Sequence, residues 1–517
     1  MINNIKTTLA LSCALSAGVT FAAENNRVNV MLIVADDLGY EEIGCLGATK
    51  GLTPNVDKLA AQGVLFTHAY VNVAICMPSR GVLGTGRYGH NSGMVGFINC
   101  NKAVPTIMEV LQKNDYMTGI LGKVKHSTPK ADYKWDFVQD YRELGAGRSP
   151  QKYYNFSKQF FAKSKQAGKP FYFMVNSHDP HRPFQRPGKF KKGSEEPSKW
   201  YKAKDVTVPS YLPDHPKVRE DLTYYYNSVR RFDDTVGLAL KALKESGMAK
   251  NTLVMLISDN GIPVPFAKCN TYLVSNKTPW IVRWPGKVKP GRVDKQHFIS
   301  GVDYFPTVMA AIGIKPPEKL DGRSFLPLLE GKTQTGREYV FTQIDHKIGS
   351  GQNARYPMRC IQNKQYGYIF NAWSDGKKRY RNSNEKLTME GMEDAAKNDP
   401  KVAARIKVYR YRTPEEFYDL QKDPGCTKNL INDSQYKQVI EDFQKRLRNW
   451  MVKYNDPLLP AFDQRGDAEA VLKVLNSTYP TIPRKNNKNS KKRKKLSAEE
   501  RKKRRAARRR KKLEQQP

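Results

Sequence analysis

Two pairs of oxygen-bearing side chains each follow an apolar segment of the sequence. Asp36 and Asp37 come directly after VNVMLIVA, and Asp259 and Asn260 come directly after NTLVMLIS. Three carboxylates and an amide are hard oxygen ligands, which suit Ca²⁺ better than a soft metal. Adjacent aspartates at a strand end can also cap a helix or form a turn. Two such pairs in one chain favour a metal site.

Two further apolar segments end in side chains that could hold an anion or move a proton. YMTGILGKVKH ends with Lys123 and His126, and PFYFMVNSHDPH ends with His178, Asp179 and His181. Lysine offers a positive charge, and histidine exchanges protons near neutral pH. A single histidine is more often structural, so these residues become candidates for an active site if the fold brings them close to the two pairs of oxygen-bearing side chains.

The arrangement of the apolar segments predicts such a fold. Each has the length of a strand and a turn-like exit, and helical patterns at 54–63, 106–114 and 219–247 lie between them. Strands that alternate with helices predict an α/β protein whose parallel sheet is covered on both faces. Sites in such sheets form outside the carboxyl ends of the strands. We therefore expect the four polar clusters to gather in one active site.

The sequence changes character beyond about residue 335. Short β-like segments with many tyrosines (REYVFTQI, RCIQNKQYGYIFNAW and EEFYDL) precede a helical pattern, QVIEDFQKRLRNWMVKY. They predict a smaller α+β subdomain with an antiparallel sheet. We divide the chain into a signal peptide at 1–22, a catalytic domain at 23–335, a C-terminal subdomain at 336–483 and a basic tail at 484–517.

Charge and the N-terminal segment indicate an exported protein with polyanionic partners. The tail has 18 Lys and Arg against three Glu, and so carries +15 of the net charge of +38. Residues 1–22 combine Lys6 with an apolar, small-residue run, which is typical of a secretory signal. We expect a periplasmic or extracellular location without integral membrane contact. The tail would then bind an acidic polysaccharide or an envelope surface, unless it is merely solvated.

One of the seven cysteines stands in a distinctive stretch. CMPSRGVLGTGR begins at Cys76 and places Pro78 and Arg80 two and four residues further on. An ordinary buried cysteine is the alternative reading of such a position. With the oxygen pairs, however, the stretch resembles the formylglycine-dependent (type I) sulfatases of the alkaline phosphatase superfamily, over about residues 27–460. In that family a formylglycine-generating or anaerobic sulfatase-maturating enzyme oxidises the cysteine to Cα-formylglycine.

The resemblance implies a fold and assigns residues. The fold would be an alkaline-phosphatase-like domain with a central mixed, mostly parallel sheet between helices. The ligands of one Ca²⁺ would be Asp36, Asp37, Cys76, Asp259 and Asn260. The catalytic residues would be Cys76, Arg80, Lys123, His126, His181 and Lys268. The family separates its lysine and histidine by one residue, and this sequence separates them by two. Either one residue bulges out, or Lys125 changes the register.

The resemblance also implies a mechanism. Hydrated formylglycine has two hydroxyls, one of which attacks sulfur while Ca²⁺ neutralises charge. Arg80 would hold this group, and Lys123, His181 and Lys268 would bind the sulfate oxygens. His181 or Lys268 would protonate the leaving group. His126 would then take a proton from the second hydroxyl, so that sulfate is expelled and the aldehyde returns.

Details of the sequence narrow the expected activity. HDPHR, HNSGMVG and the eight-residue spacing from Asn260 to Lys268 look most like the heparan N-sulfatase branch, the N-sulfoglucosamine sulfohydrolases. We expect a secreted sulfatase that cleaves sulfate esters or sulfamates on a sulfated polysaccharide or its oligosaccharides. Two alternatives stay open: a phosphonate or phosphate ester hydrolase of the same superfamily, and a catalytically dead protein that binds polyanions.

Overall fold

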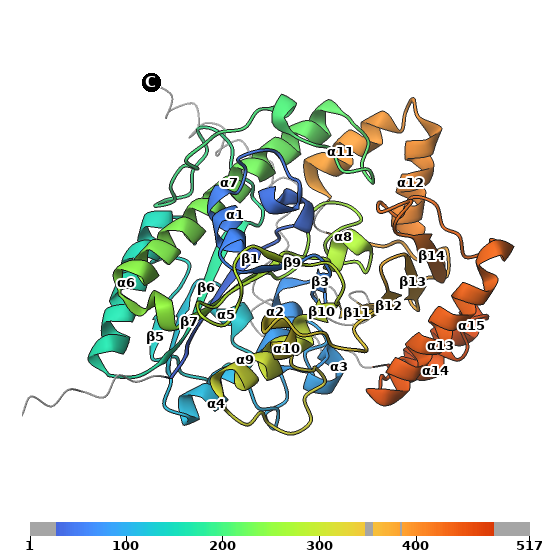
Figure 1. Cartoon of the computed structure of the whole chain (residues 1–517). Helices are drawn as coiled ribbons and strands as arrows, with labels where there is room; N and C mark the ends of the chain where they lie inside the picture. Colours follow the sequence, from blue (N-terminus) through green and yellow to red (C-terminus); the bar gives the residue numbers. More distant parts are fainter. Residues whose placement is uncertain (1–26, 347–354, 383–384, 480–517) are drawn as a thin grey trace, which may run out of the picture.

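The structure is a computed structural model that describes residues 27–346, 355–382 and 385–479. The predicted signal peptide and basic tail lie outside these residues. The described chain contains an eight-stranded sheet flanked by helices, and a four-stranded sheet toward the C-terminus (Figure 1). No described helix has both the length and the apolar character that a membrane crossing requires.

The large sheet is mixed and mostly parallel, as predicted. Its strands, in spatial order, are β5 (Phe137–Gln139), β4 (Met117–Leu121), β6 (Phe171–Pro180), β1 (Asn29–Asp36), β7 (Thr252–Ser258), β8 (Trp280–Arg283), β2 (Val64–Phe66) and β9 (Arg292–Asp294). The strands from β5 to β7 run parallel to one another. β8 is antiparallel to both of its neighbours, and β9 pairs with β2 in parallel.

Helices cover both faces of this sheet (Figure 1). One face packs against α1 (Pro54–Ala61), α6 (Pro150–Gln166) and α7 (Pro216–Glu245), and the other against α4 (Ile107–Lys113) and α9 (Tyr304–Ile312). The central strand β1 serves both cores, because successive side chains point to opposite faces. Met31 and Ile33 belong to the first core, whereas Leu32 and Val34 belong to the second. This explains why its sequence is apolar throughout rather than alternating.

The predicted helices at 54–63, 106–114 and 219–247 are confirmed as α1, α4 and α7. The start of α4 is fixed by a capping box, in which the Thr106 side chain accepts from the Glu109 amide and the Glu109 carboxylate accepts from the Thr106 amide. The sequence reasoning missed α6, although Tyr153, Phe160 and Phe161 of that helix are buried in the first core.

The C-terminal part contains the predicted antiparallel sheet. Its order is β11 (Val340–His346), β12 (Arg355–Gln362), β13 (Tyr366–Asn371) and β14 (Glu415–Asp419). The predicted helix that follows is α13 (Lys437–Lys453), and two helices that were not predicted, α11 (Lys386–Ala395) and α12 (Pro400–Tyr411), lie between β13 and β14. Met358 and Phe370 of this sheet belong to the same core as Met31 of β1, so the two parts share one continuous hydrophobic core.

The remaining elements are short, apart from α2, which carries the cysteine motif, and α15. They are β3 (Ala69–Tyr70), β10 (Ile299–Ser300), α2 (Cys76–Thr85), α3 (Gly89–Ser92), α5 (Val124–Ser127), α8 (Leu273–Asn276), α10 (Leu326–Leu329), α14 (Leu459–Phe462) and α15 (Ala468–Thr478), with 3-10 turns at Tyr40–Glu42, Gly44–Leu46, Ala203–Asp205, Met248–Asn251, Gly301–Asp303 and Ser434–Tyr436.

Candidate active site

The carboxyl ends of the central strands bring the four polar clusters to one edge of the sheet. β1 lies between β6 and β7, and β4 lies on the other side of β6. Asp37 directly follows β1, His181 follows β6 and Asp259 follows β7, while Lys123 comes two residues after β4. The parallel direction of these four strands places all four exits on the same side. The predicted gathering of these clusters is confirmed.

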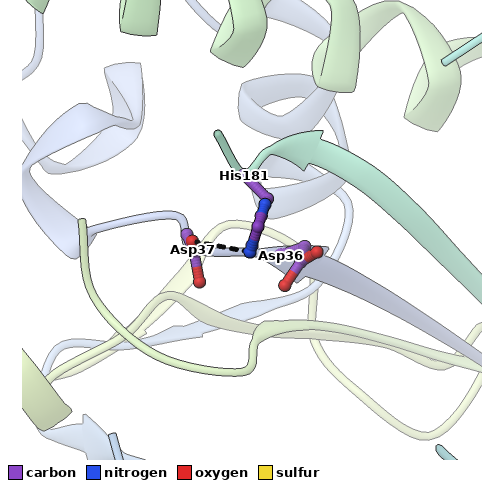
Figure 2. A group of neighbouring side chains, drawn as sticks. All are labelled: Asp36, Asp37 and His181. Carbon is purple, nitrogen blue, oxygen red and sulfur yellow. Dashed lines mark ion pairs between the residues drawn. The ribbon is translucent and has the colours of Figure 1, made fainter. Parts of the chain in front are cut away.

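A group of carboxylates and one imidazole forms the centre of the site. Ligand atoms of Asp36, Asp37 and His181 all lie within 4.8 Å of one another. Figure 2 shows His181, on the segment after β6, reaching toward Asp37 with Asp36 beside it. The Asp37 amide donates to Oδ1 of Asp259 at 3.0 Å, and Nδ2 of Asn260 donates to Oδ1 of Asp37 at 2.7 Å. The two oxygen pairs found in the sequence are therefore in direct contact.

Several oxygens of this group are buried without a hydrogen-bond partner among the described residues. They are Oδ1 of Asp36, Oδ2 of Asp37 and Oδ1 of Asn260. Burial raises the pKa of Asp259, and the neighbouring Asp36 and Asp37 raise it further, even with Arg80 beside it. Buried anionic oxygens without donors are costly unless a cation meets them. The residues thus fit a hard divalent cation such as Ca²⁺.

Arg80 connects four elements behind this group. The side chain is buried in α2, and its Nε donates to Oδ2 of Asp259 at 2.8 Å. Its Nη1 donates to Oγ of Ser127 on α5 at 3.0 Å and to Oδ1 of Asn176 on β6 at 2.6 Å. The guanidinium therefore fixes the start of α2 relative to the ends of β6 and β7. Burial opposes its charge, but Asp259 and Asp36 raise the pKa of Arg80 above its ordinary value.

Cys76 is the first residue of α2, so the cysteine lies at the start of a helix. Its side chain is buried, and burial raises the pKa of the thiol to about 11, although Lys268 and Lys123 favour the thiolate. The charged neighbours that act on this pKa, including Asp36 and Asp259, belong to the site described above. The thiol is therefore protonated at neutral pH and is a weak nucleophile in this form.

The structure answers the question of register between Lys123 and His126. Lys123 adopts a left-handed backbone (φ 50°) at the N-terminal cap of α5, is buried and forms an ion pair with Asp36. His126 follows within α5, and burial together with the charges of Lys123 and Arg80 lowers its pKa to about 3. Lys125 is exposed. Lys123 and His126 therefore both belong to the site, and Lys125 is the residue that turns outward.

His178 lies within the last part of β6 and His181 directly follows that strand, and the two side chains occupy different positions. Nε2 of His181 lies 3.9 Å from Oδ2 of Asp37, and its Nδ1 lies 2.5 Å from the carbonyl oxygen of Arg182. Burial lowers the pKa of His181, although Asp37 and Asp36 act in the opposite direction. His178 packs against Gly147, where a Cβ would come within 1.9 Å of the imidazole Nδ1. The residue predicted to contact sulfate thus also stands beside the candidate metal ligands.

Lys268 completes the group of cations. It is buried, and its Nζ lies 2.5 Å from Oδ1 of Asp37. Burial disfavours its charge, but Asp37 raises the pKa of Lys268 well above its ordinary value, so the side chain stays protonated. All the predicted site residues are accordingly brought together. Asn176 and Ser127 were missed, although Asn176 is the first polar residue after the apolar part of β6 and could have been noticed.

Comparison with known proteins agrees with this geometry. The family described as Sulfatase matches residues 28–314, and the family described as the N-sulphoglucosamine sulphohydrolase C-terminal region matches residues 265–378. The chain belongs to the sulfatase family and is a sulfuric ester hydrolase. The predicted family and class of enzyme are confirmed.

Individual relatives cover most of the chain. The chain is 29% identical to human N-sulphoglucosamine sulphohydrolase over 472 aligned residues, and the alignment covers 84% of this chain and 92% of the relative. It is 31% identical to an ulvan-active sulfatase of Formosa agariphila over 449 residues, which is 84% of this chain and 82% of the relative. The crystal structure of the phosphonate monoester hydrolase of Agrobacterium radiobacter shares the fold, with a TM-score of 0.63 and 19% identity over 83% of this chain and 96% of that one.

Proposed function

We propose that this sulfatase removes sulfate from a sulfated polysaccharide or its oligosaccharides, at a sulfate ester or a sulfamate. The proposal rests on one observation: the start of α2, with Cys76, lies in the same buried group as orphaned carboxylate oxygens and lysine ammonium groups. Relatives named for a sulfated glucosamine and for ulvan support a carbohydrate substrate.

Two groups would complete the site. Asp36, Asp37, Asp259 and Asn260 would hold Ca²⁺, which when bound supplies positive charge to a sulfate oxygen and to the nucleophile. Cys76, converted to Cα-formylglycine, would supply an oxygen nucleophile in place of the protonated thiol. The high pKa of the thiol supports this conversion, because an unmodified Cys76 would react poorly at neutral pH.

The charges of the site suit a sulfate monoanion. The buried ionisable groups are three carboxylates and three cations: Asp36, Asp37, Asp259, Arg80, Lys123 and Lys268. When all are ionised they balance, so that a bound divalent cation leaves an excess of positive charge for the substrate. Lys123 and Lys268 would face the sulfate oxygens and stabilise the charge that develops on them in the transition state. Their burial strengthens this effect, because little water screens them.

We assign to His126 the role of the base that completes turnover. Its Nδ1 has no hydrogen-bond partner among the described residues, and burial favours the neutral form of the ring. A neutral imidazole with a free ring nitrogen can take a proton as sulfate is released. His181 or Lys268 would protonate the leaving group, and Arg80 would hold the start of α2 in place through its contacts with Asp259, Ser127 and Asn176.

The first experiment is peptide mass spectrometry across residue 76 on protein produced with a maturation enzyme. An aldehyde at this position, combined with turnover of 4-methylumbelliferyl sulfate, is the expected result. Cys76→Ala should fold normally and lose turnover. An unmodified thiol in an active enzyme, or near-normal turnover by Cys76→Ala, would refute the proposed chemistry. Heparan and ulvan oligosaccharides, glucosamine N-sulfate and its O-sulfated isomers would then be screened for the preferred substrate.

We also propose that the protein is exported to the periplasm or the exterior, and that its tail binds polyanions. Residues 1–22 and the charge of 484–517 support this. N-terminal sequencing of the protein recovered outside the cytoplasm should begin near residue 23. Deletion of 484–517 should weaken retention on heparin at low salt, and unchanged retention would contradict the role of the tail.

A further inference from the structure

A pocket with many basic side chains lies beside the candidate active site. Its volume is about 630 Å³, and its walls come from Arg148, the segment 182–194, Asp221 of α7 and the first residues of α11. Arg148 joins the pocket to the site. Its Nη2 donates to the carbonyl oxygens of His178 at 3.3 Å and His181 at 2.7 Å. A side chain that lines this pocket therefore holds the backbone that carries the active-site histidine, and His181 is followed directly by Arg182 of the pocket wall.

The charges around the pocket do not balance. It is lined by one carboxylate, Asp221, and by six cations: Arg148, Arg182, Arg186, Lys189, Lys191 and Lys386. Asp221 is already engaged, because both of its oxygens accept from the Arg182 guanidinium and Oδ2 also accepts from Oγ1 of Thr388 at 2.6 Å.

Arg148 is paired with Asp179, but the remaining four cations have no acidic partner in the described part of the chain. Arg186, Lys189, Lys191 and Lys386 form no ion pair with any described residue. Like charges gathered in a concave surface repel one another and attract an anion from solution. The pocket therefore has an excess of positive charge that a ligand can neutralise.

Aromatic rings give the pocket a second property. Phe190 lines it and is 41% exposed, which is unusual for so large an apolar side chain. The guanidinium of Arg186 lies 4.6 Å from the ring centroid of Tyr224, a stacking contact that restricts its motion. A flat apolar ring next to oriented cations suits a ring-shaped ligand that carries an anionic substituent.

We propose that this pocket binds a carboxylate or a second sulfate on the sugar unit next to the one that is desulfated. The inference rests on the proposed function and extends it, because it makes the preferred substrate an oligosaccharide with at least two anionic groups. Arg186, Lys189 and Lys386 contact the second anion, and Phe190 packs against the sugar ring. A substrate with one sulfate and no second anion uses the active site but not this pocket.

The test compares two substrates with matured full-length protein. One is 4-methylumbelliferyl sulfate, which carries a single anion, and the other is whichever heparan or ulvan oligosaccharide the wild type desulfates. The variant Arg186→Gln/Lys189→Gln removes two pocket charges. The control Lys165→Gln/Lys445→Gln removes two charges from exposed residues that do not line the pocket.

The pocket variant should lower kcat/KM for the oligosaccharide about tenfold, mainly through KM, and change kcat/KM for the aryl sulfate less than twofold. The control should change neither by more than about twofold. Carboxyl-reduced and partly desulfated oligosaccharides identify the anion, since the form lacking the relevant group should bind the wild type and the variant equally. Equal thermal midpoints of the variants show that the fold is intact.

Three outcomes would overturn the inference. The first is an equal loss on both substrates, and the second is an equal effect of pocket variant and control. The third is turnover of the aryl sulfate with no oligosaccharide accepted. In each of these cases the wild type still hydrolyses a sulfate ester, so the proposed chemistry stands. A wild type that carries formylglycine and hydrolyses no sulfate would instead refute the proposed function, and this inference with it.

Discussion

Arg80→Met would show how strongly the site depends on its buried ion pair. The Arg80 side chain is 1% exposed and donates to Asp259, Ser127 and Asn176 at 2.6–3.0 Å. Methionine fills much of the same volume but leaves the buried Asp259 carboxylate without its cation. Removal of one partner of such a pair costs about 3–5 kcal/mol. At about 2 °C per kcal/mol for a large domain, the midpoint of thermal unfolding should fall by roughly 6–10 °C.

The assay is thermal unfolding followed by tryptophan fluorescence, in a double-mutant cycle with Asp259→Asn. Asparagine carries no charge at position 259, so the double variant Arg80→Met/Asp259→Asn leaves no unpaired carboxylate there. Its free energy of unfolding should be at least about 2 kcal/mol higher than the sum of the two single effects predicts. Arg448→Met is the control, because Arg448 makes a similar contact with Asp463 on the surface. An exposed pair of this kind contributes little to stability, because water and salt screen its charges.

Calcium provides a second test of the ion pair between Arg80 and Asp259. The unfolding should be repeated in EDTA and in excess Ca²⁺. A cation bound at Asp259 would replace part of the charge that Arg80→Met removes, so the deficit should shrink in Ca²⁺. The wild type should gain about 2.7 kcal/mol when Ca²⁺ is at 100 times its Kd. Strictly additive effects in the cycle, or a loss in Arg80→Met no larger than in Arg448→Met, would refute the reasoning.

Three further predictions follow from the same geometry. Lys123→Ala should lower kcat/KM for an aryl sulfate by a factor of about 100 or more, because Lys123 is buried in the site. Lys125→Ala should change kcat/KM less than twofold, because Lys125 is exposed. Equal losses in the two variants would contradict the assigned register. In the unfolded chain His126 becomes protonated below a pH of about 6.5, whereas in the folded chain its pKa is about 3. The free energy of unfolding therefore decreases as the pH falls from about 6.5 toward 3. Between pH 7 and pH 5, the free energy of unfolding measured in urea should therefore decrease by roughly 1–2 kcal/mol less for His126→Gln than for the wild type. If the two proteins lose stability in parallel over this range, the His126 ring is not held neutral in the folded chain. Gly147→Ala should lower the thermal midpoint by about 4 °C or more, because a Cβ there meets the His178 ring and the backbone φ is +69°; an unchanged midpoint would show that the loop yields freely.

The sequence was most informative where one physical requirement dominates. β1 and β7 are buried on both faces, so their apolar segments could be recognised, and the polar pairs after them had to lie at the sheet edge. The register at Lys123 could not be predicted, since it depends on a left-handed backbone that lysine rarely adopts. Arg148 was missed for another reason. It comes from a loop without periodicity, and its partner Asp179 is 31 residues away.

The sequence analysis missed the C-terminal helix α12 because its sequence gives a weak signal. In α12 only Ile406 and Tyr409 are buried, so the helix presents no continuous apolar stripe. The helix α6 was also missed, although its buried residues Tyr153, Phe160 and Phe161 give a clearer pattern. The antiparallel strands were easier, because β-branched and aromatic residues are concentrated in them.

The complete burial of α2 has a consequence for how active molecules arise. Every residue from Cys76 to Thr85 is buried in the folded chain, and Arg80 fastens the helix from behind. An enzyme that converts Cys76 to formylglycine, as proposed above, would therefore have to reach it before the catalytic domain closes, and modification would compete in time with folding. A molecule that folds first would keep its thiol and, under the proposed chemistry, stay inactive, however stable it is. Preparations from a host with slow maturation would then contain two well-folded populations, and the active fraction would record the outcome of that competition.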